Sequence, residues 1–155
     1  MNGVAVISEL ALDPGFGSAI GQGVGAIALY AVVGLVLMVV GFYAIDFTTP
    51  GKLSNLVRAG APNAVIVTSA GLVSMALIVV VAIYNAAGKL DEGLLTALIF
   101  GFVGVVVQVL AVRLLEWVTR LDIGSLIGSD RFAPASVVVA SAHVALGLVV
   151  AVAIS

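Results

Sequence analysis

The sequence predicts an all-α integral membrane protein with four transmembrane helices, arranged as two tandem two-helix repeats. Apolar residues make up 63% of the 155-residue chain and charged residues only 9%. A soluble domain is closer to half apolar and a quarter charged. A chain of this length cannot bury so much apolar surface in its own core. Its outer surface must therefore face lipid, and the spacing of the charges and an internal repeat define the architecture.

The charged residues leave four long uncharged windows. They lie between residues 13 and 46, between 58 and 89, between 92 and 113, and after 131. A helix needs ~20 mostly apolar residues to span a bilayer, and these continuous windows lack the alternation of a membrane β-barrel. We therefore expect helices over 20–46, 62–87, 93–117 and 134–154. The corresponding units are an extracytoplasmic or interfacial segment, 1–19, and two transmembrane hairpins, 20–87 and 88–155. The first segment has no basic stretch before its apolar run, so we do not expect a signal peptide.

Two ten-residue stretches indicate an internal duplication. APNAVIVTSA at 61–70 and APASVVVASA at 133–142 agree at six positions. Proline suits the first turn of a helix, so each stretch should begin an outgoing span. Units of two spans share one orientation in the membrane, which makes this a parallel repeat. Small residues permit close helix approach in lipid, and the sequence predicts such packing faces at Gly17, Gly21, Gly25, Ser69 and Ser141.

The basic residues predict the orientation. Five of them flank the first and third interhelical loops, whereas Lys89 alone lies on the opposite side. Because Lys and Arg collect in cytoplasmic loops, we expect both hairpin loops in the cytoplasm and both termini outside. The net charge of −2 provides no basic surface for nucleic acid. Lipid is the expected environment, and a homo-oligomer or a larger membrane complex is the expected assembly.

The first loop, GFYAIDFTTPGKL at 41–53, has the most distinctive sequence. A carboxylate at Asp46 would oppose the dipole at the end of a helix, so it needs a partner: Lys52, Arg58 or the following backbone. Thr49 and Pro50 resemble an N-cap and a first helical residue. They predict a short interfacial helix from residue 50, with its leucines at 53 and 56 facing lipid.

Together with Asn63 at the start of the next span, the pattern Asp46, Thr49, Pro50, Gly51 resembles small bacterial membrane proteins classified as domain of unknown function 350, or uncharacterised protein family 0719. The resemblance covers all four spans and is strongest over residues 41–70. Members commonly carry two copies of a two-helix unit. The second copy here departs from the pattern, because no Thr-Pro follows Asp122. The resemblance implies a bacterial cytoplasmic-membrane protein and implies no activity.

A charged cluster marks the end of the third span. Arg113, Glu116 and Arg120 are spaced three and four residues apart, which places them on one helical face, and Glu116 can pair with either arginine. One interpretation is an interfacial ion-pair cluster that anchors the helix while the arginine stems snorkel. The alternative is a cytoplasmic-side binding patch for an anionic headgroup or a partner.

Two polar residues lie deeper, and they are candidates for an intramembrane pair. Gln108 and His143 are each nine residues from the predicted cytoplasmic ends of their helices, which is ~13 Å at 1.5 Å per residue. They can therefore meet across the second hairpin. One interpretation is a structural hydrogen bond between helices. The other is a proton or ion relay through His143, although no carboxylate lies near the hydrocarbon centre.

The sequence shows no nucleophile–base pair, nucleotide loop or metal-ligand pattern, so we expect neither an enzyme nor a cofactor or metal. The expected function is that of a non-catalytic accessory or self-associating membrane component. The alternative is a channel or carrier for a proton, an ion or a small solute, formed by an oligomer.

Overall fold

The computed structural model describes residues 15–48, 52–86, 89–120 and 122–155. Four long helices are apolar and long enough to cross a membrane, which confirms the predicted class. Within the described residues the helices are α2 (Phe16–Thr48), α3 (Leu53–Arg58), α4 (Pro62–Asn85), α5 (Leu90–Thr119), α6 (Ile123–Ile127) and α7 (Ala135–Ala153). The long helices start and end within a few residues of the predicted bounds. Helix α2 begins at Phe16, so its first turn belongs to the segment assigned to 1–19.

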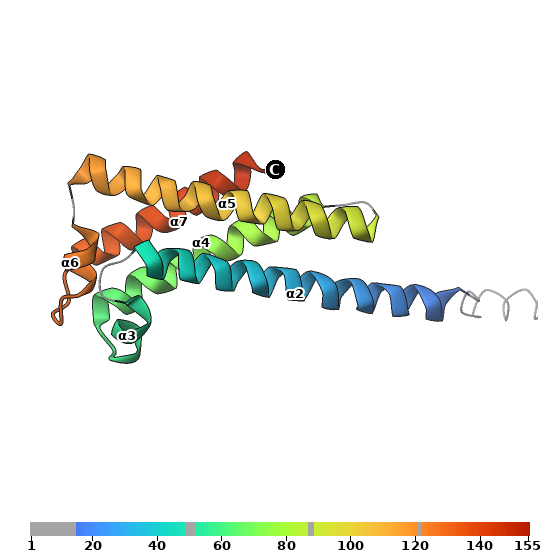
Figure 1. The fold of residues 1–155 in the computed structure, drawn as a ribbon, viewed down its shortest axis with the longest axis horizontal. Helices are drawn as coiled ribbons and strands as arrows, with labels where there is room; N and C mark the ends of the chain where they lie inside the picture. Colours follow the sequence, from blue (N-terminus) through green and yellow to red (C-terminus); the bar gives the residue numbers. More distant parts are fainter. Residues whose placement is uncertain (1–14, 49–51, 87–88, 121) are drawn as a thin grey trace, which may run out of the picture.

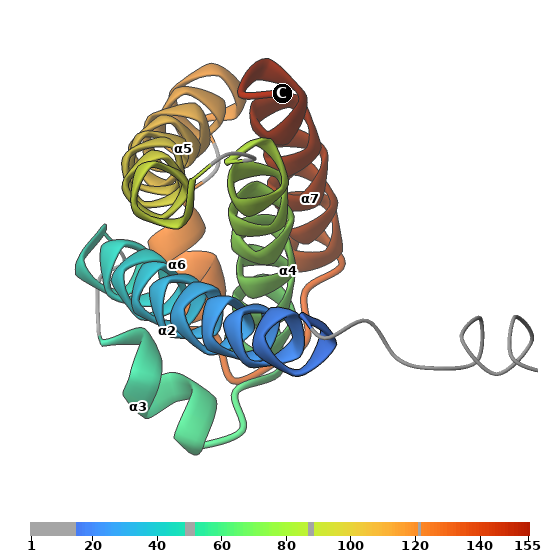
Figure 2. The same ribbon diagram turned by 90° about the vertical axis from the view of Figure 1, so that its right-hand side faces the viewer.

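Helix α4 lies at the centre of the bundle. It packs most extensively against α7 and also contacts α5 and α2 (Figures 1 and 2). A long, a short and a long helix follow one another in each half of the chain, α2 to α4 and then α5 to α7. This order fits the predicted two-helix units, while the duplication itself stays a prediction. The largest helix contact joins the two halves, so neither hairpin packs as an independent domain.

Glycines bring the helices together in the interior. A Cβ atom placed on Gly147 of α7 would lie 2.8 Å from the Cβ of Ser74 on α4. Added Cβ atoms at Gly101 and Gly104 of α5 would meet Leu37 of α2 and Ile78 of α4 in the same way. Small residues thus permit the close helix approach that packing in lipid requires.

The residues predicted to form packing faces lie elsewhere. A Cβ atom on Gly17, Gly21 or Gly25 would meet nothing within 4 Å, and Ser69 and Ser141 are exposed on their helices. The structure therefore does not place these five residues between helices of one chain. The long spans are apolar on every side, so the sequence pattern could not distinguish a face towards protein from one towards lipid.

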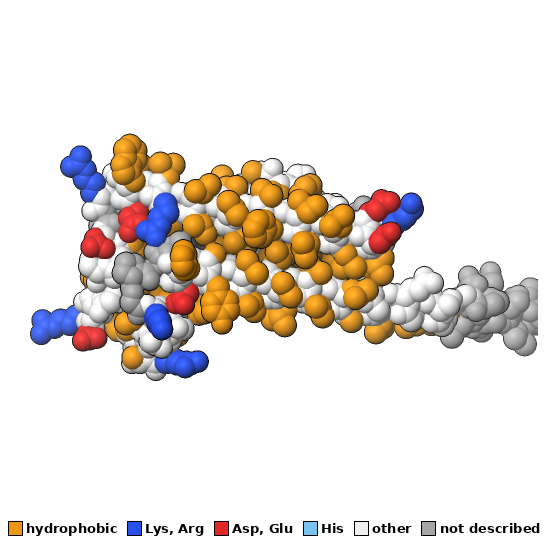
Figure 3. All heavy atoms as spheres, in the orientation of Figure 1, with side chains coloured by type: hydrophobic (Ala, Val, Ile, Leu, Met, Phe, Trp, Pro, Cys, Tyr) orange, Lys and Arg blue, Asp and Glu red, His pale blue; other side chains and the backbone are white. Residues whose placement is uncertain are grey.

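The two ends of the bundle are charged and the middle is apolar (Figure 3). The 24 residues of α4 correspond to about 36 Å, slightly more than the hydrocarbon thickness of about 30 Å. Exposed aromatic side chains lie towards opposite ends of the spans, Trp117 near the end of α5 and Tyr84 near the end of α4. Such residues are typical of the two membrane interfaces. We call the end that carries α3 and α6 the basic end.

Candidate functional site

Gln108 and His143 meet inside the bundle, as their equal depth predicts. Both are buried, with 1% and 3% of their surface exposed. The Nε2 atom of Gln108 donates a hydrogen bond of 3.1 Å to the backbone carbonyl oxygen of His143. The side-chain amide therefore reaches the other helix through its backbone, and the imidazole ring is not part of this hydrogen bond.

Several buried polar atoms have no hydrogen-bond partner among the described residues. They are Gln108 Oε1, His143 Nδ1, Thr68 Oγ1 and Ser74 Oγ. Leaving such an atom unsatisfied costs about 1–3 kcal/mol. Most buried polar groups in proteins are satisfied, and these four atoms lie on the three helices α4, α5 and α7.

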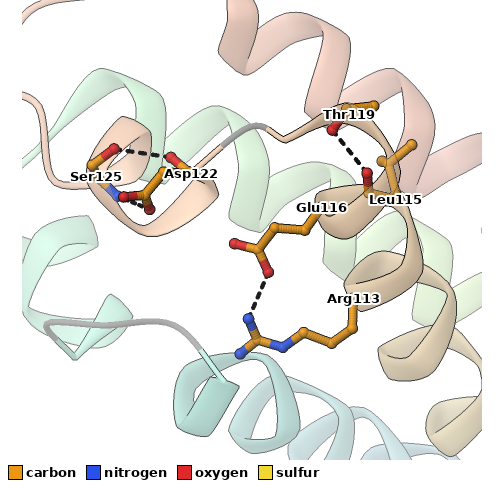
Figure 4. Close-up of polar contacts among 6 residues, drawn as sticks. All are labelled: Arg113, Leu115, Glu116, Thr119, Asp122 and Ser125. Carbon is orange, nitrogen blue, oxygen red and sulfur yellow. Dashed lines mark hydrogen bonds and ion pairs between the residues drawn. The ribbon is translucent and has the colours of Figure 1, made fainter.

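The charged cluster of α5 begins about one helical turn closer to the basic end. Arg113 Nη1 and Glu116 Oε2 form an ion pair of 2.6 Å (Figure 4). Two arginines could pair with Glu116, and in the structure Arg113 does so. Arg120 instead caps the C-terminus of α5, with a positive φ of 55°. Such a pair, with side-chain exposures of 45% and 25%, suits a membrane interface.

A cavity of about 30 Å³ connects the two polar features. Its lining includes Gln108, His143, Arg113 and Glu116 together with apolar side chains. In the sequence, the deep pair and the charged cluster are separate features. They share one cavity because α4, α6 and the end of α2 enclose the space beside α5 and α7. Among the residues that the structure describes, no group of three or more His, Asp or Glu side chains could hold a metal ion.

Asp46, in the last turn of α2, and Asp122, the N-cap of α6, each accept a hydrogen bond from the first turn of a short helix. Asp46 Oδ1 accepts a hydrogen bond of 3.2 Å from the backbone N–H of Ser54, in the first turn of α3. Asp122 Oδ1 accepts one of 2.9 Å from Ser125 in the first turn of α6, as Figure 4 shows. Among the three expected partners of Asp46, the structure thus provides the following backbone. Each carboxylate compensates the unpaired N–H groups and the dipole at the start of a short helix.

The predicted start and environment of the first short helix need correction. Helix α3 begins at Leu53, after Lys52 with a positive φ of 54°, and not at residue 50. Leu53 is fully buried against the protein and does not face lipid, because α3 packs on α4. Thr49, Pro50 and Gly51, three positions of the family pattern, lie outside the described residues.

Asn63 fastens the two loop regions together. It is fully buried, and its Nδ2 atom donates to the carbonyl oxygens of Ser129 at 3.2 Å and Arg131 at 2.8 Å. Its Oδ1 atom accepts from the backbone N–H of Ala133 at 2.9 Å. The sequence identified Asn63 as part of a family pattern, and the structure assigns it these contacts with the second loop.

Asn85 makes a similar contact at the other end of α4. Its Nδ2 atom donates a hydrogen bond of 3.0 Å to the carbonyl oxygen of Ile154, beyond the end of α7. Asn85 is not among the residues predicted from the sequence. Its position at the end of an apolar window was the available signal, since a polar amide there can satisfy an unpaired helix-end carbonyl. Asparagines therefore hold α4 to the second half at both membrane boundaries.

Comparison with known proteins places these features in a family. The family model described as Domain of Unknown Function (DUF350) matches residues 19–154. A UPF0719 transmembrane protein of Mycolicibacterium paratuberculosis is 33% identical over 135 residues, covering 86% of this chain and 89% of the relative. UPF0719 transmembrane proteins of Mycobacterium bovis and Mycobacterium tuberculosis are each 36% identical over 81 residues, about half of either chain. No solved structure matches the chain. The chain belongs to the DUF350 family of transmembrane proteins, as its loop pattern and four spans predict.

Proposed function

We propose that this protein is a non-catalytic component of the bacterial cytoplasmic membrane, with both termini outside, that associates with a second copy of itself through α2. The observation that carries the proposal is the length of α2 relative to its neighbours. Its 33 residues correspond to about 50 Å of helix, well beyond the hydrocarbon thickness of about 30 Å.

The first part of α2 extends past the rest of the bundle (Figure 1). The hydroxyl of Tyr30 donates a hydrogen bond of 3.4 Å to the carbonyl oxygen of Ala86, at the end of α4. Tyr30 is therefore level with the end of the bundle opposite the basic end. The preceding residues, from Phe16 to Leu29, continue for about 20 Å more.

This extension is apolar and unpacked. Ile20, Val24 and Ile27 are 50%, 61% and 70% exposed. Contiguous exposed apolar surface on a protein usually marks an interaction site. Because the extension projects beyond the level of the charged residues 89–92, water would contact these apolar side chains unless protein covers them.

The glycine face of the extension favours a second copy as the cover. Gly17, Gly21 and Gly25 recur every four residues, and added Cβ atoms there would meet nothing in this chain. Two α2 helices that have the same orientation in the membrane can therefore pack closely side by side through their glycine faces. Such packing would bury the apolar residues beside the glycines.

The test is the mass of the assembly in native lipid. The protein is extracted in lipid-preserving polymer discs, and the mass and identity of everything in each disc are measured. We expect a homo-oligomer for the wild type, a monomer for Gly21→Leu, and an unchanged oligomer for Gly23→Leu, whose substitution lies on another face of α2. A monomeric wild type would overturn the proposal, and stoichiometric unrelated subunits would replace it with an accessory role in a larger complex.

The buried polar pair favours a second candidate function, an oligomeric channel or carrier for a proton, an ion or a small solute. Gln108 and His143 lie at the depth where transported species bind in many membrane proteins. Flux into vesicles that contain the wild type, and its loss in His143→Ala and Gln108→Ala, would support this candidate. Equal flux in wild type, variants and empty vesicles would reject it.

A further inference from the structure

The deep end of the cavity combines space with unsatisfied polar atoms. Gln108 Oε1 and His143 Nδ1 belong to buried side chains that line the cavity, and both atoms lack partners among the described residues. The volume of about 30 Å³ exceeds the 10–15 Å³ that one water molecule needs. The lining is mostly apolar, but the space is large enough for a water molecule and its lining includes two side chains with an unsatisfied polar atom, and a buried water needs two to four polar partners.

We propose that this cavity holds water and makes His143 a proton-binding site that communicates only with the basic end of the bundle. A proton from bulk water at that end reaches the cavity water and binds the free nitrogen of the neutral imidazole, which becomes imidazolium. It leaves by the same route. The inference deepens the second candidate function and does not depend on association through α2.

The lining determines the direction of access. Towards the basic end the cavity reaches Arg113 and Glu116, which are partly exposed to the interface. Glu116 is eight residues from Gln108 on α5, about 12 Å along the helix. Its carboxylate lies at the mouth, where Arg113 holds it in place through their ion pair.

Among the described residues, the other elements that face the cavity contribute no further charged or titratable group. Helix α2 contributes Ile45, α4 contributes Val67 and Met75, and α6 contributes apolar residues. Arg113 and Glu116 are thus the charged groups that line the cavity with His143.

Towards the opposite end, α4 packs closely against α5 and α7 through apolar and small side chains. Beyond Ser74, the buried residues on α4 before Asn85 are Met75, Ile78, Val79 and Ala82. Gly104 of α5 packs against Ile78, and Gly147 of α7 packs against Ser74. No polar side chain among the described residues on these contact faces bridges the interval. Water and protons should therefore enter from one side.

The chain is suited to a direct test because His143 is its single histidine. Selective labelling with ¹⁵N-histidine gives one residue to observe by solid-state nuclear magnetic resonance in lipid vesicles. We expect rapid magnetisation transfer from water to the imidazole. We also expect its signals to shift from neutral imidazole to imidazolium between about pH 8 and about pH 4, a range that brackets the ordinary histidine pKa of about 6.5.

A matched pair of variants separates cavity water from lipid exposure. Val109 lines the cavity, whereas Val107 is 41% exposed on the same helix. Val109→Phe should fill the space and abolish water transfer to His143, while Val107→Phe should leave it unchanged. Gln108→Leu, a second variant that alters the polar lining without a larger ring, should reduce the transfer.

Sidedness is measured in vesicles with the chain inserted in one orientation, by changing the pH on one side at a time. The imidazole signals should shift when the basic end is acidified and remain constant when the opposite end is acidified. Absence of water transfer in the wild type, absence of a shift over the whole range, or an equal response from both sides would each overturn the inference. These measurements report water access and proton binding, and they do not report transport. If the vesicle assay shows no flux while His143 still binds a proton, only the second candidate function is rejected.

Discussion

Among substitutions at the basic end that remove equally few atoms, Asn63→Ala should destabilise the bundle most. Asn63 makes three hydrogen bonds to the segment between α6 and α7, with lengths of 3.2, 2.8 and 2.9 Å. A net hydrogen bond contributes about 0.5–1.5 kcal/mol, so the three together are worth about 2–4 kcal/mol. Because the side chain is fully buried, water cannot readily replace it.

The free energy of unfolding is measured by reversible denaturation in mixed detergent micelles, with circular dichroism as the readout. Asn63→Ala should lower it by about 2–4 kcal/mol. Asn55→Ala, an exposed asparagine on α3, is the control and should change it by less than about 0.5 kcal/mol. Equal values for the two variants would refute the assignment of Asn63 as the link between the loops.

Asn63→Asp distinguishes the hydrogen bonds from the volume of the side chain. Aspartate has nearly the same shape and can still accept from the N–H of Ala133. It cannot donate to the carbonyl oxygens of Ser129 and Arg131, and it brings a carboxylate towards both. We expect it to destabilise the bundle at least as strongly as alanine does. Wild-type stability in this variant would show that the donated bonds contribute nothing.

Three further predictions concern packing, orientation and the charged cluster. Gly147→Ala would place a Cβ 2.9 Å from a backbone Cα of α4 and should lower the free energy of unfolding by about 1–3 kcal/mol, whereas Gly23→Ala, in open space, should change it by no more than about 1 kcal/mol. The chain contains no cysteine, so a membrane-impermeant maleimide should label Ser155→Cys in intact cells and leave Ser125→Cys unlabelled; the reverse would invert the proposed orientation. Glu116→Gln should lower stability by less than about 1 kcal/mol, since the ion pair is partly exposed, and a larger loss in the same denaturation assay would contradict an interfacial pair.

The distribution of charges was sufficient to predict the four spans. Charged residues and helix-starting prolines mark the points where the chain leaves and enters lipid, and Pro62 begins α4 as expected. Depth was also predictable, because a rise of 1.5 Å per residue places Gln108 and His143 at one level. These predictions depend on distance along the chain, which a sequence contains.

The choice of helix face was not predictable in the same way. Gly21 and Gly147 are both glycines in apolar helices, yet a Cβ would meet nothing at the first and α4 at the second. An apolar side chain is compatible with both lipid and protein interior, so hydrophobicity does not distinguish the two. The contacts of Asn63 escaped prediction because they join residues separated by 66 to 70 positions.

The predicted duplication gives a physical reason for the asymmetry of the site. Positions 71 and 143 are equivalent at the 72-residue offset that aligns the two repeated stretches. A Cβ on Gly71 would lie 3.7 Å from His143 Nδ1, so the two equivalent positions face each other where α4 meets α7. Equivalent helices of a parallel repeat meet in this way around a shared axis.

Two large side chains would compete for the same space at such a contact. The glycine in the first half leaves room for the imidazole in the second, and His143 and Gln108 both line the cavity. The first half instead contributes Asn63, which holds the second loop in place. One half thus supplies space and the loop contact, and the other supplies the polar groups. Because these contributions differ, a chain with two copies of either hairpin would keep four spans but lack one of the contributions, so the site needs one copy of each.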